Sequence, residues 1–185
     1  YALMTIRQER IIAHPAIMEW FIERCEQRGS RNILIAEAEK YISGLIESKI
    51  CDRQWNVTLL TDNYLFGRLF ETHFESYTNV HVLLGSIYLP LPMHQKFDDI
   101  LAIPNFGMRM YVNNVPIRDS ETAAANYLLP LLKEEGRLSV TFPARVMISS
   151  GKTADWRQEV NGSVQAIIAL PDGILRPYTA IKTYQ

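Results

Sequence analysis

The fold is decided by residues 97–107, which read FDDILAIPNFG. The apolar run from Phe97 to Ile103 predicts a β-strand, and a loop from Pro104 to Arg109 follows it. Open α/β sheets bind ligands just beyond the carboxyl ends of their strands. The loop after this strand is therefore the first place to look for a functional site.

The same alternation of strand-like and helical stretches continues on both sides of this segment. Further apolar runs predict strands at residues 32–36, 55–60, 80–84, 137–142 and 164–170. Helical spacing predicts a first helix that begins near Pro15 and ends at Gly29, and others at residues 37–50, 121–134 and 153–160. Asp62 is a candidate N-cap for one more helix, which carries Leu65, Leu69, Phe70 and Phe74. Near-continuous apolar strands alternating with helices indicate a parallel α/β sheet covered on both faces.

The composition is that of a globular domain. Of the 185 residues, 48% are hydrophobic and 21% are charged, which excludes a disordered chain. The formal net charge is −1, without the basic surplus of proteins that bind DNA unaided. Any contact with DNA would need a local patch or a partner.

The cysteines, the histidines and the chain ends indicate further which class of protein this is. Cys25 and Cys51 lack a C-x-x-C spacing and are typical of buried, reduced thiols in a cytoplasmic protein. The histidines show no metal-ligand spacing, so we expect no metal. No apolar run is long enough to span a membrane, and no signal peptide precedes the first helix. Because the chain starts at Tyr1 and stops where a strand pattern begins, we expect it to be part of a longer protein.

Several motifs together resemble the N-6 adenine DNA methylases, in particular the modification subunit of type I restriction–modification systems. Residues 97–107 resemble that family's F-D-x-I-L-x-N-P-P-F-G, and residues 136–143 resemble its G-G-R-x-x-x-V-x-P. Residues 164–183 resemble A-I-I-x-L-P-x-G followed by P-Y-T-x-I-K-T, and residues 14–18 resemble its T-P-x-x-I. The resemblance implies a class I S-adenosylmethionine-dependent methyltransferase-like (Rossmann-like) sheet with helices on both faces. Residues 1–30 would be a helical lead-in, and residues 31–185 a methyltransferase-like core truncated at an antiparallel last strand.

The resemblance places a cofactor site after the first strand, where active relatives have D-P-A-C-G-S-G-G. Residues 35–42 stand there as IAEAEKYI, so the glycines are replaced by Glu39, Tyr41 and Ile42. Glycines let the backbone approach the methionine moiety of S-adenosylmethionine, whereas these side chains would fill its space. Glu37 and Glu39 would also put negative charge beside its carboxylate. The family positions for cofactor binding include Ala36, Glu37 and Glu39.

Other positions implied for the cofactor follow the second and third strands. Asp62 stands where the family has the acid that binds the ribose hydroxyls, although a plain helix N-cap is the favoured interpretation. Gly85 and Ser86 stand where the family often has a Gly-Asp pair near the adenine, so that carboxylate is lost.

The catalytic tetrapeptide of the family is altered as well. There, an Asn side chain and a Pro carbonyl accept hydrogen bonds from the adenine amine, while an aromatic ring stacks on the flipped base. Here the four residues are Ile103, Pro104, Asn105 and Phe106. Phe106 could stack and the Pro104 carbonyl is available, but the Ile103 side chain cannot accept a hydrogen bond. Asn105 would need a different backbone path.

Two other features have a bland and a sharper interpretation. The SSGKT segment at residues 149–153 ends like a phosphate-binding P-loop, but Val146 stands where that motif requires glycine. The uncharged loop at residues 87–93 is expected to pack over the sheet edge. A contact with a missing domain or subunit is the alternative.

The sequence thus favours a catalytically degenerate methyltransferase-fold module that serves as a structural or DNA-proximal part of a larger protein. The alternative is an active S-adenosylmethionine-dependent DNA adenine-N6 methyltransferase. The family implies S-adenosylmethionine as cofactor, although the loop after the first strand makes its binding doubtful. It also implies DNA and separate specificity and restriction subunits as partners. No membrane association is expected.

Overall fold

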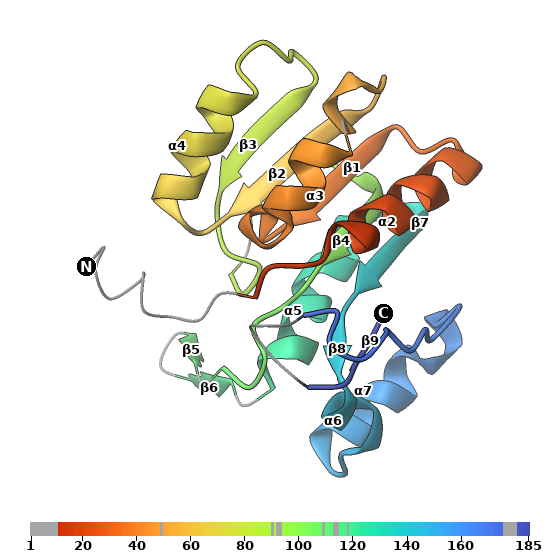
Figure 1. Ribbon diagram of the computed structural model, residues 1–185. Helices are drawn as coiled ribbons and strands as arrows, with labels where there is room; N and C mark the ends of the chain where they lie inside the picture. Colours follow the sequence, from red (N-terminus) through yellow and green to blue (C-terminus); the bar gives the residue numbers. More distant parts are fainter. Residues whose placement is uncertain are drawn as a thin grey trace.

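The computed structural model describes residues 11–48, 50–89, 91, 94–108, 110–112, 115–117, 119–175 and 181–185. Within these residues, five strands form a sheet in the order β3-β2-β1-β4-β7, with every neighbouring pair parallel (Figure 1). The strands are β1 (Asn32–Ala36), β2 (Asn56–Thr61), β3 (Val80–Leu84), β4 (Phe97–Ala102) and β7 (Leu132–Val140). The predicted parallel sheet is confirmed, and β1 and β3 have the predicted bounds.

Two apolar clusters cover the two faces of the sheet. Ile33 and Ile35 of β1 point to one face, and pack in a cluster with residues of α2 (Pro15–Arg28), α3 (Ile42–Glu47) and α4 (Tyr64–His73). Leu34 and Ala36 point to the other face, where α5 (Ser120–Leu128) contributes Ala124 and Leu128. Figure 1 shows α2 and α3 over one face and α5 on the opposite side. Because successive side chains of a strand alternate between faces, the continuous apolar run of β1 is buried on both.

The remaining elements lie beyond the carboxyl end of the sheet or in its connections. Strand β5 (Met110–Val112) pairs antiparallel with β6 (Val115–Ile117), and β8 (Phe142–Pro143) pairs antiparallel with β9 (Thr183–Tyr184). Helices α6 (Ala144–Ile148) and α7 (Lys152–Val160) follow β8 (Figure 1). Short 3-10 helices are η1 (Ala38–Tyr41), η2 (Ile50–Asp52), η3 (Leu129–Leu131) and η4 (Asn161–Ser163).

The paired acids of the deciding segment tie β4 to its neighbours at the amino end of the sheet. Asp99 accepts hydrogen bonds from Arg28, at 2.6 Å, and from the Ser30 hydroxyl. Asp98 accepts hydrogen bonds from the Asn32 backbone N–H and from Lys133 Nζ, both at 2.8 Å. These acids therefore support the fold and lie at the end of β4 remote from the candidate site.

Several predicted elements were wrong in type or extent. The predicted helix at 37–50 is broken into a turn at Glu37, η1, the short α3 and η2. The predicted helix at 121–134 ends much earlier, because Pro130 lies in η3 and proline cannot continue an α-helix. β7 consequently starts at Leu132, before the predicted 137, and ends at Val140. Gly136 lies at an irregularity in its pairing with β4, where an added Cβ would stand 2.8 Å from the Phe97 carbonyl oxygen.

The predicted strand at 164–170 is also wrong. Only the end of this segment is hydrogen-bonded to residues 183–185, which include β9. There, the N–H groups of Ile168 and Leu170 donate to the carbonyls of Gln185 and Thr183. Val164 and Ile167 remain 46% and 60% exposed. An apolar run extends as a strand only where a neighbouring strand accompanies it, and the described neighbour here is the short β9.

The predicted buried thiols and the loop at residues 87–93 can be compared directly with the structure. Cys25 and Cys51 are free and buried, as expected. In the loop at residues 87–93, Ile87 and Tyr88 are buried, whereas Leu89 is 48% exposed. Residues 90, 92 and 93 of this loop lie outside the described residues. Within the described residues, no helix is long and apolar enough to cross a membrane, and no cluster of side chains is suited to a metal ion. Residues 1–10 of the lead-in and residues 176–180, which carry part of the resemblance to P-Y-T-x-I-K-T, lie outside the described residues.

Candidate functional site

Two loops leave the carboxyl edge of the sheet side by side. β1 and β4 are adjacent and in register, with Ala36 opposite Ala102. The chain then continues into residues 37–41, which we call the β1 loop, and residues 103–108, which we call the β4 loop. Parallel pairing thus places the position implied for the cofactor next to the position implied for the catalytic tetrapeptide.

The β1 loop turns sharply at Glu37. Its φ of 53° makes it the one non-glycine residue in the described part of the chain with a left-handed backbone. A left-handed non-glycine residue costs about 1–2 kcal/mol, so the surroundings must enforce it. The Lys40 N–H donates to the Glu37 carbonyl at 2.9 Å, and the Lys40 ammonium forms an ion pair with the Glu37 carboxylate. The turn is therefore closed through both the backbone and the side chains.

This ion pair is buried and connects the two loops. The side chains of Lys40 and Glu37 are 3% and 6% exposed. Lys40 Nζ also donates to the backbone carbonyl of Ile103 at 2.5 Å. Burial raises the pKa of Glu37, and the adjacent Lys40 ammonium opposes that rise. The first residue of the altered tetrapeptide is thus held by a cation from the β1 loop.

The other residues at the positions implied for the cofactor differ in how far they are buried. Ala36, Glu39 and Tyr41 are buried, whereas Ile42 is half-buried. The Tyr41 hydroxyl has no hydrogen-bond partner among the described residues, and burial, together with the Glu37 charge, raises its pKa well above the usual value. Side chains therefore fill the interior of the β1 loop.

The positions after β2 and β3 differ from the expectations. Asp62 is exposed and is not the N-cap of α4, so that interpretation was wrong. The cap is Asn63, whose side-chain oxygen accepts hydrogen bonds from the N–H groups of Leu65 and Phe66. Helical dihedral angles begin at Tyr64, so the residue immediately before it occupies the capping position. Leu65 and Leu69 are exposed, whereas Phe70 and Phe74 are buried.

Gly85 and Ser86 are half-buried at the end of β3. An added Cβ on Gly85 would lie 2.8 Å from a methyl group of Leu91. The Ser86 hydroxyl accepts a hydrogen bond from the Tyr88 N–H at 3.3 Å. Both residues thus have a structural part in the loop that follows β3.

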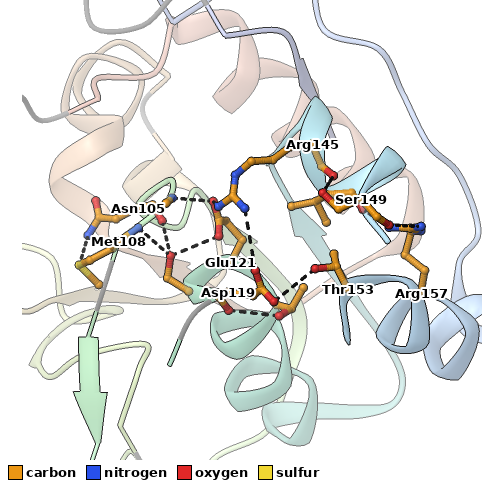
Figure 2. A network of polar contacts seen from close by, with 12 residues as sticks. Asn105, Met108, Asp119, Glu121, Arg145, Ser149, Thr153 and Arg157 are labelled. Atoms are coloured by element: carbon orange, nitrogen blue, oxygen red, sulfur yellow. Dashed lines mark hydrogen bonds and ion pairs between the residues drawn. The ribbon is translucent and has the colours of Figure 1, made fainter. Parts of the chain in front are cut away.

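Side chains of other elements hold the backbone of the β4 loop (Figure 2). The Asn105 N–H donates to the Tyr88 hydroxyl at 2.8 Å, and the Ser120 hydroxyl donates to the Asn105 carbonyl at 3.0 Å. The Gly107 N–H donates to the Glu121 carboxylate at 2.8 Å, and the Met108 N–H donates to the Ser120 hydroxyl at 3.1 Å. Because backbone groups along the loop are tied to Tyr88 and to the first turn of α5, the loop has a single defined path.

The Glu121 carboxylate joins this loop to α6. Glu121 is fully buried, and Arg145 of α6 donates a hydrogen bond to it. Arg145 also lies 3.9 Å from Asp119, which accepts a hydrogen bond from the Thr153 hydroxyl at 3.2 Å (Figure 2). The network therefore extends from the β4 loop through α5 to the start of α7.

The four tetrapeptide residues lie together but present different faces. Ile103 and Pro104 are buried, whereas Asn105 and Phe106 are half-buried. Phe106 packs against the apolar cluster under α2 and α3. The Asn105 amide nitrogen lies 3.9 Å from the Met108 sulfur (Figure 2). Only the last two residues could touch a ligand without a change in the loop.

Two hollows among the described residues lie away from these loops. One, of ≈ 430 Å³, is lined by Ala154, Arg157, Gln158 and Asn161 of α7 and η4. Another, of ≈ 290 Å³, lies where α4 faces β3. Neither is lined by a residue of the β1 loop or the β4 loop.

Sequence reasoning missed the residues that organise the site: Lys40, Tyr88, Ser120, Glu121 and Arg145. The sequence contained two usable signals. One was the opposite charges of Glu37 and Lys40 at a spacing of three residues. The other was the single acid, Glu121, in the small-residue segment SETAAA. Neither signal reveals a partner in a distant loop.

Comparison with known proteins supports the fold assignment. No family model matches the chain, and no curated protein matches it in sequence. A class I S-adenosylmethionine-dependent methyltransferase structure from Listeria monocytogenes superposes with a TM-score of 0.68 at 14% identity, over 92% of this chain and 57% of that chain. The 23S rRNA methyltransferase ErmE gives 0.59 at 14% identity, over 95% of this chain and 69% of that one.

Aeropyrum pernix fibrillarin, in complex with S-adenosylmethionine, gives a TM-score of 0.53 at 14% identity, over 84% of this chain and 65% of that chain. This chain spans little more than half the length of the Listeria structure described above. The chain has the class I S-adenosylmethionine-dependent methyltransferase-like fold, a Rossmann-like parallel sheet with helices on both faces.

Proposed function

We propose that this chain is a non-catalytic methyltransferase-fold module, similar to the N-6 adenine DNA methylase subunit of type I restriction–modification systems. The observation that carries this proposal is the buried bridge from Glu37 through Lys40 to the Ile103 carbonyl. This bridge joins the two neighbouring loops, between which an active relative would bring cofactor and base together.

The residues of the β1 loop do not fit S-adenosylmethionine. A nucleotide-binding loop of this kind brings bare backbone close to the ligand, and the glycines that allow it are absent here. Glu39 and Tyr41 are buried within the loop, and the ion pair fills its turn with opposite charges. Cofactor binding would require the buried Glu37–Lys40 pair to open, and exposing either partner alone leaves an uncompensated buried charge.

The β4 loop supports the same conclusion from the base side. Its first two residues are buried, and its backbone is tied to Tyr88, Ser120 and Glu121. The Ile103 side chain offers no acceptor for an adenine amine, and its carbonyl already accepts a hydrogen bond from Lys40. We infer that the loop serves as a rigid structural element.

The proposed role is that of a structural or DNA-proximal module beside separate specificity and restriction subunits. The formal net charge of −1 is compatible with contact with DNA that depends on a partner. In such an assembly the partner would supply most of the phosphate contacts and the base readout.

Two observations favour the alternative, an active DNA adenine-N6 methyltransferase. Structures with the same fold include fibrillarin with natively bound S-adenosylmethionine, and Phe106 remains half-buried at the position of the stacking aromatic residue. In that case the β1 loop would rearrange on cofactor binding.

Titration calorimetry with S-adenosylmethionine distinguishes the two functions. The sample is first shown to unfold cooperatively, and an active class I methyltransferase serves as the positive control. We expect no heat of binding, and no transfer of a labelled methyl group to adenine-containing duplex DNA. Micromolar binding would contradict the proposed loss of the cofactor site, and methyl transfer would establish the alternative.

A further inference from the structure

The Lys40 ammonium has the surroundings of a bound ligand rather than those of a surface side chain. It is enclosed, with the side chain 3% exposed, and it contacts a carboxylate of its own loop and a carbonyl 63 residues further along the chain. Lysine is almost never fully buried unless it is paired. Here the pair lies where the β1 loop contacts the β4 loop, so the cation binds to both of them.

The backbone of Lys40 is anchored independently of its side chain. Its N–H donates to the Glu37 carbonyl at 2.9 Å, and its carbonyl accepts a hydrogen bond from the Ala13 N–H at 2.6 Å. Shortening the side chain therefore leaves these backbone anchors in place. The substitution removes the cation, and the Glu37 carboxylate and the Ile103 carbonyl then face the enclosed space that the side chain filled.

We propose that the contact between the β1 and β4 loops, formed by the Glu37 carboxylate and the Ile103 carbonyl, is a binding site for a small primary ammonium ion. Lys40 is the tethered cation that fills this site. The carboxylate supplies the charge, and the carbonyl requires an N–H donor. A ligand must therefore carry both a positive charge and N–H groups, as a primary alkylammonium does. This site does not depend on the proposed relation to DNA methylases.

Chemical rescue of Lys40→Ala tests the proposal. The substitution keeps Cβ and removes the three following methylene groups and the nitrogen, which n-propylammonium reproduces. We expect Lys40→Ala to unfold at a lower temperature than the wild type. Added n-propylammonium should raise its midpoint by about 3 °C or more at ten times the dissociation constant.

Matched compounds and variants separate binding from general stabilisation. n-Propanol lacks the charge, tetramethylammonium lacks the N–H donors, and sodium chloride reproduces the ionic strength, so none of these should rescue Lys40→Ala. The wild type, whose site is filled, should not respond to n-propylammonium. The double variant Glu37→Gln with Lys40→Ala lacks the carboxylate and should respond at least tenfold more weakly.

Equal rescue by n-propanol, an equal response of the wild type or the double variant, or a Lys40→Ala protein as stable as the wild type would each overturn the proposal. If Lys40→Ala does not fold alone, the readout is the refolding yield from denaturant with n-propylammonium against n-propanol. An increase with the ammonium compound alone is then expected, and equal yields overturn the proposal. Binding of S-adenosylmethionine to the wild type would refute the proposed function and leave the result of this rescue unaffected.

Discussion

Replacing Glu121 tests whether α5 holds the β4 loop in place. The Glu121 carboxylate is fully buried and accepts hydrogen bonds from the Gly107 N–H and from Arg145. A hydrogen bond to a charged group contributes about 1.5–3 kcal/mol. Gly107 is an exposed residue, so no further cost for a buried donor without an acceptor is added. Arg145 is 42% exposed and regains water when it is released, so its share is small.

From these contacts we expect Glu121→Ala to lower the free energy of unfolding by about 2–4 kcal/mol. For a chain of this size the unfolding midpoint would fall by on the order of 10 °C. Glu121→Gln keeps an acceptor for Gly107 and loses the charge, and should cost about 1–2 kcal/mol. Both values are measured by urea unfolding.

Hydrogen exchange gives the local readout that overall stability does not. The amides of Gly107 and Met108 should exchange faster in Glu121→Ala than in the wild type, by a larger factor than amides of β1. Arg68→Ala is the control, because the Arg68–Glu71 pair is exposed and should contribute less than about 1 kcal/mol. A Glu121→Ala protein within about 0.5 kcal/mol of the wild type, or unchanged exchange at Gly107, would refute this account of the loop.

Further predictions concern helix packing and pH. Gly44→Ala places a Cβ 2.6 Å from the Met18 Cβ, so α2 and α3 must separate, and we expect a loss of about 1–3 kcal/mol in urea unfolding. Gly162→Ala, which meets nothing within 4 Å, should be nearly neutral, and equal effects at the two glycines would contradict the packing argument. Although burial opposes it, hydrogen bonds from Lys133 and from backbone N–H groups lower the pKa of Asp98 below 3.8. A lowered pKa stabilises the fold above the unfolded value, and this stability is lost as the pH falls through the folded value. The stability difference between the wild type and Asp98→Asn should therefore shrink as the pH is lowered past 3.8, and a constant difference would be inconsistent with it.

The strands were predictable because their signal is local. β1 and β3 begin and end where the apolar runs at 32–36 and 80–84 do. The early end of α5 was also encoded locally, by Pro130, and was overlooked. The run at 164–170 has the same apolar character as a buried strand. Its exposure depends on which chain segments lie beside it, and a local pattern contains no information about that.

The sequence predicted which residues follow β4, but not which side chains hold the loop that they form. The sequence placed Ile103 at the end of a predicted strand and Pro104, Asn105 and Phe106 in the loop after it, whereas β4 ends at Ala102 and all four residues lie in the loop. The sequence did not reveal that Tyr88 and Glu121 would hold that loop, because their contacts with it span 17 and 14 residues of sequence. The left-handed turn at Glu37 was likewise unexpected, since its ion pair with Lys40 stabilises a conformation that propensity disfavours.

By itself, the sequence determined the class of fold and the chemical identity of the residues after β1 and β4. Both follow from the order of apolar runs and from side chains that can be read one at a time. Only the tertiary structure decided that the Lys40 ammonium lies against the Ile103 carbonyl and that the Glu121 carboxylate lies against the Gly107 N–H. The physical reason is that parallel pairing of β1 with β4, and packing of α5 beneath them, bring together loops that no local interaction connects.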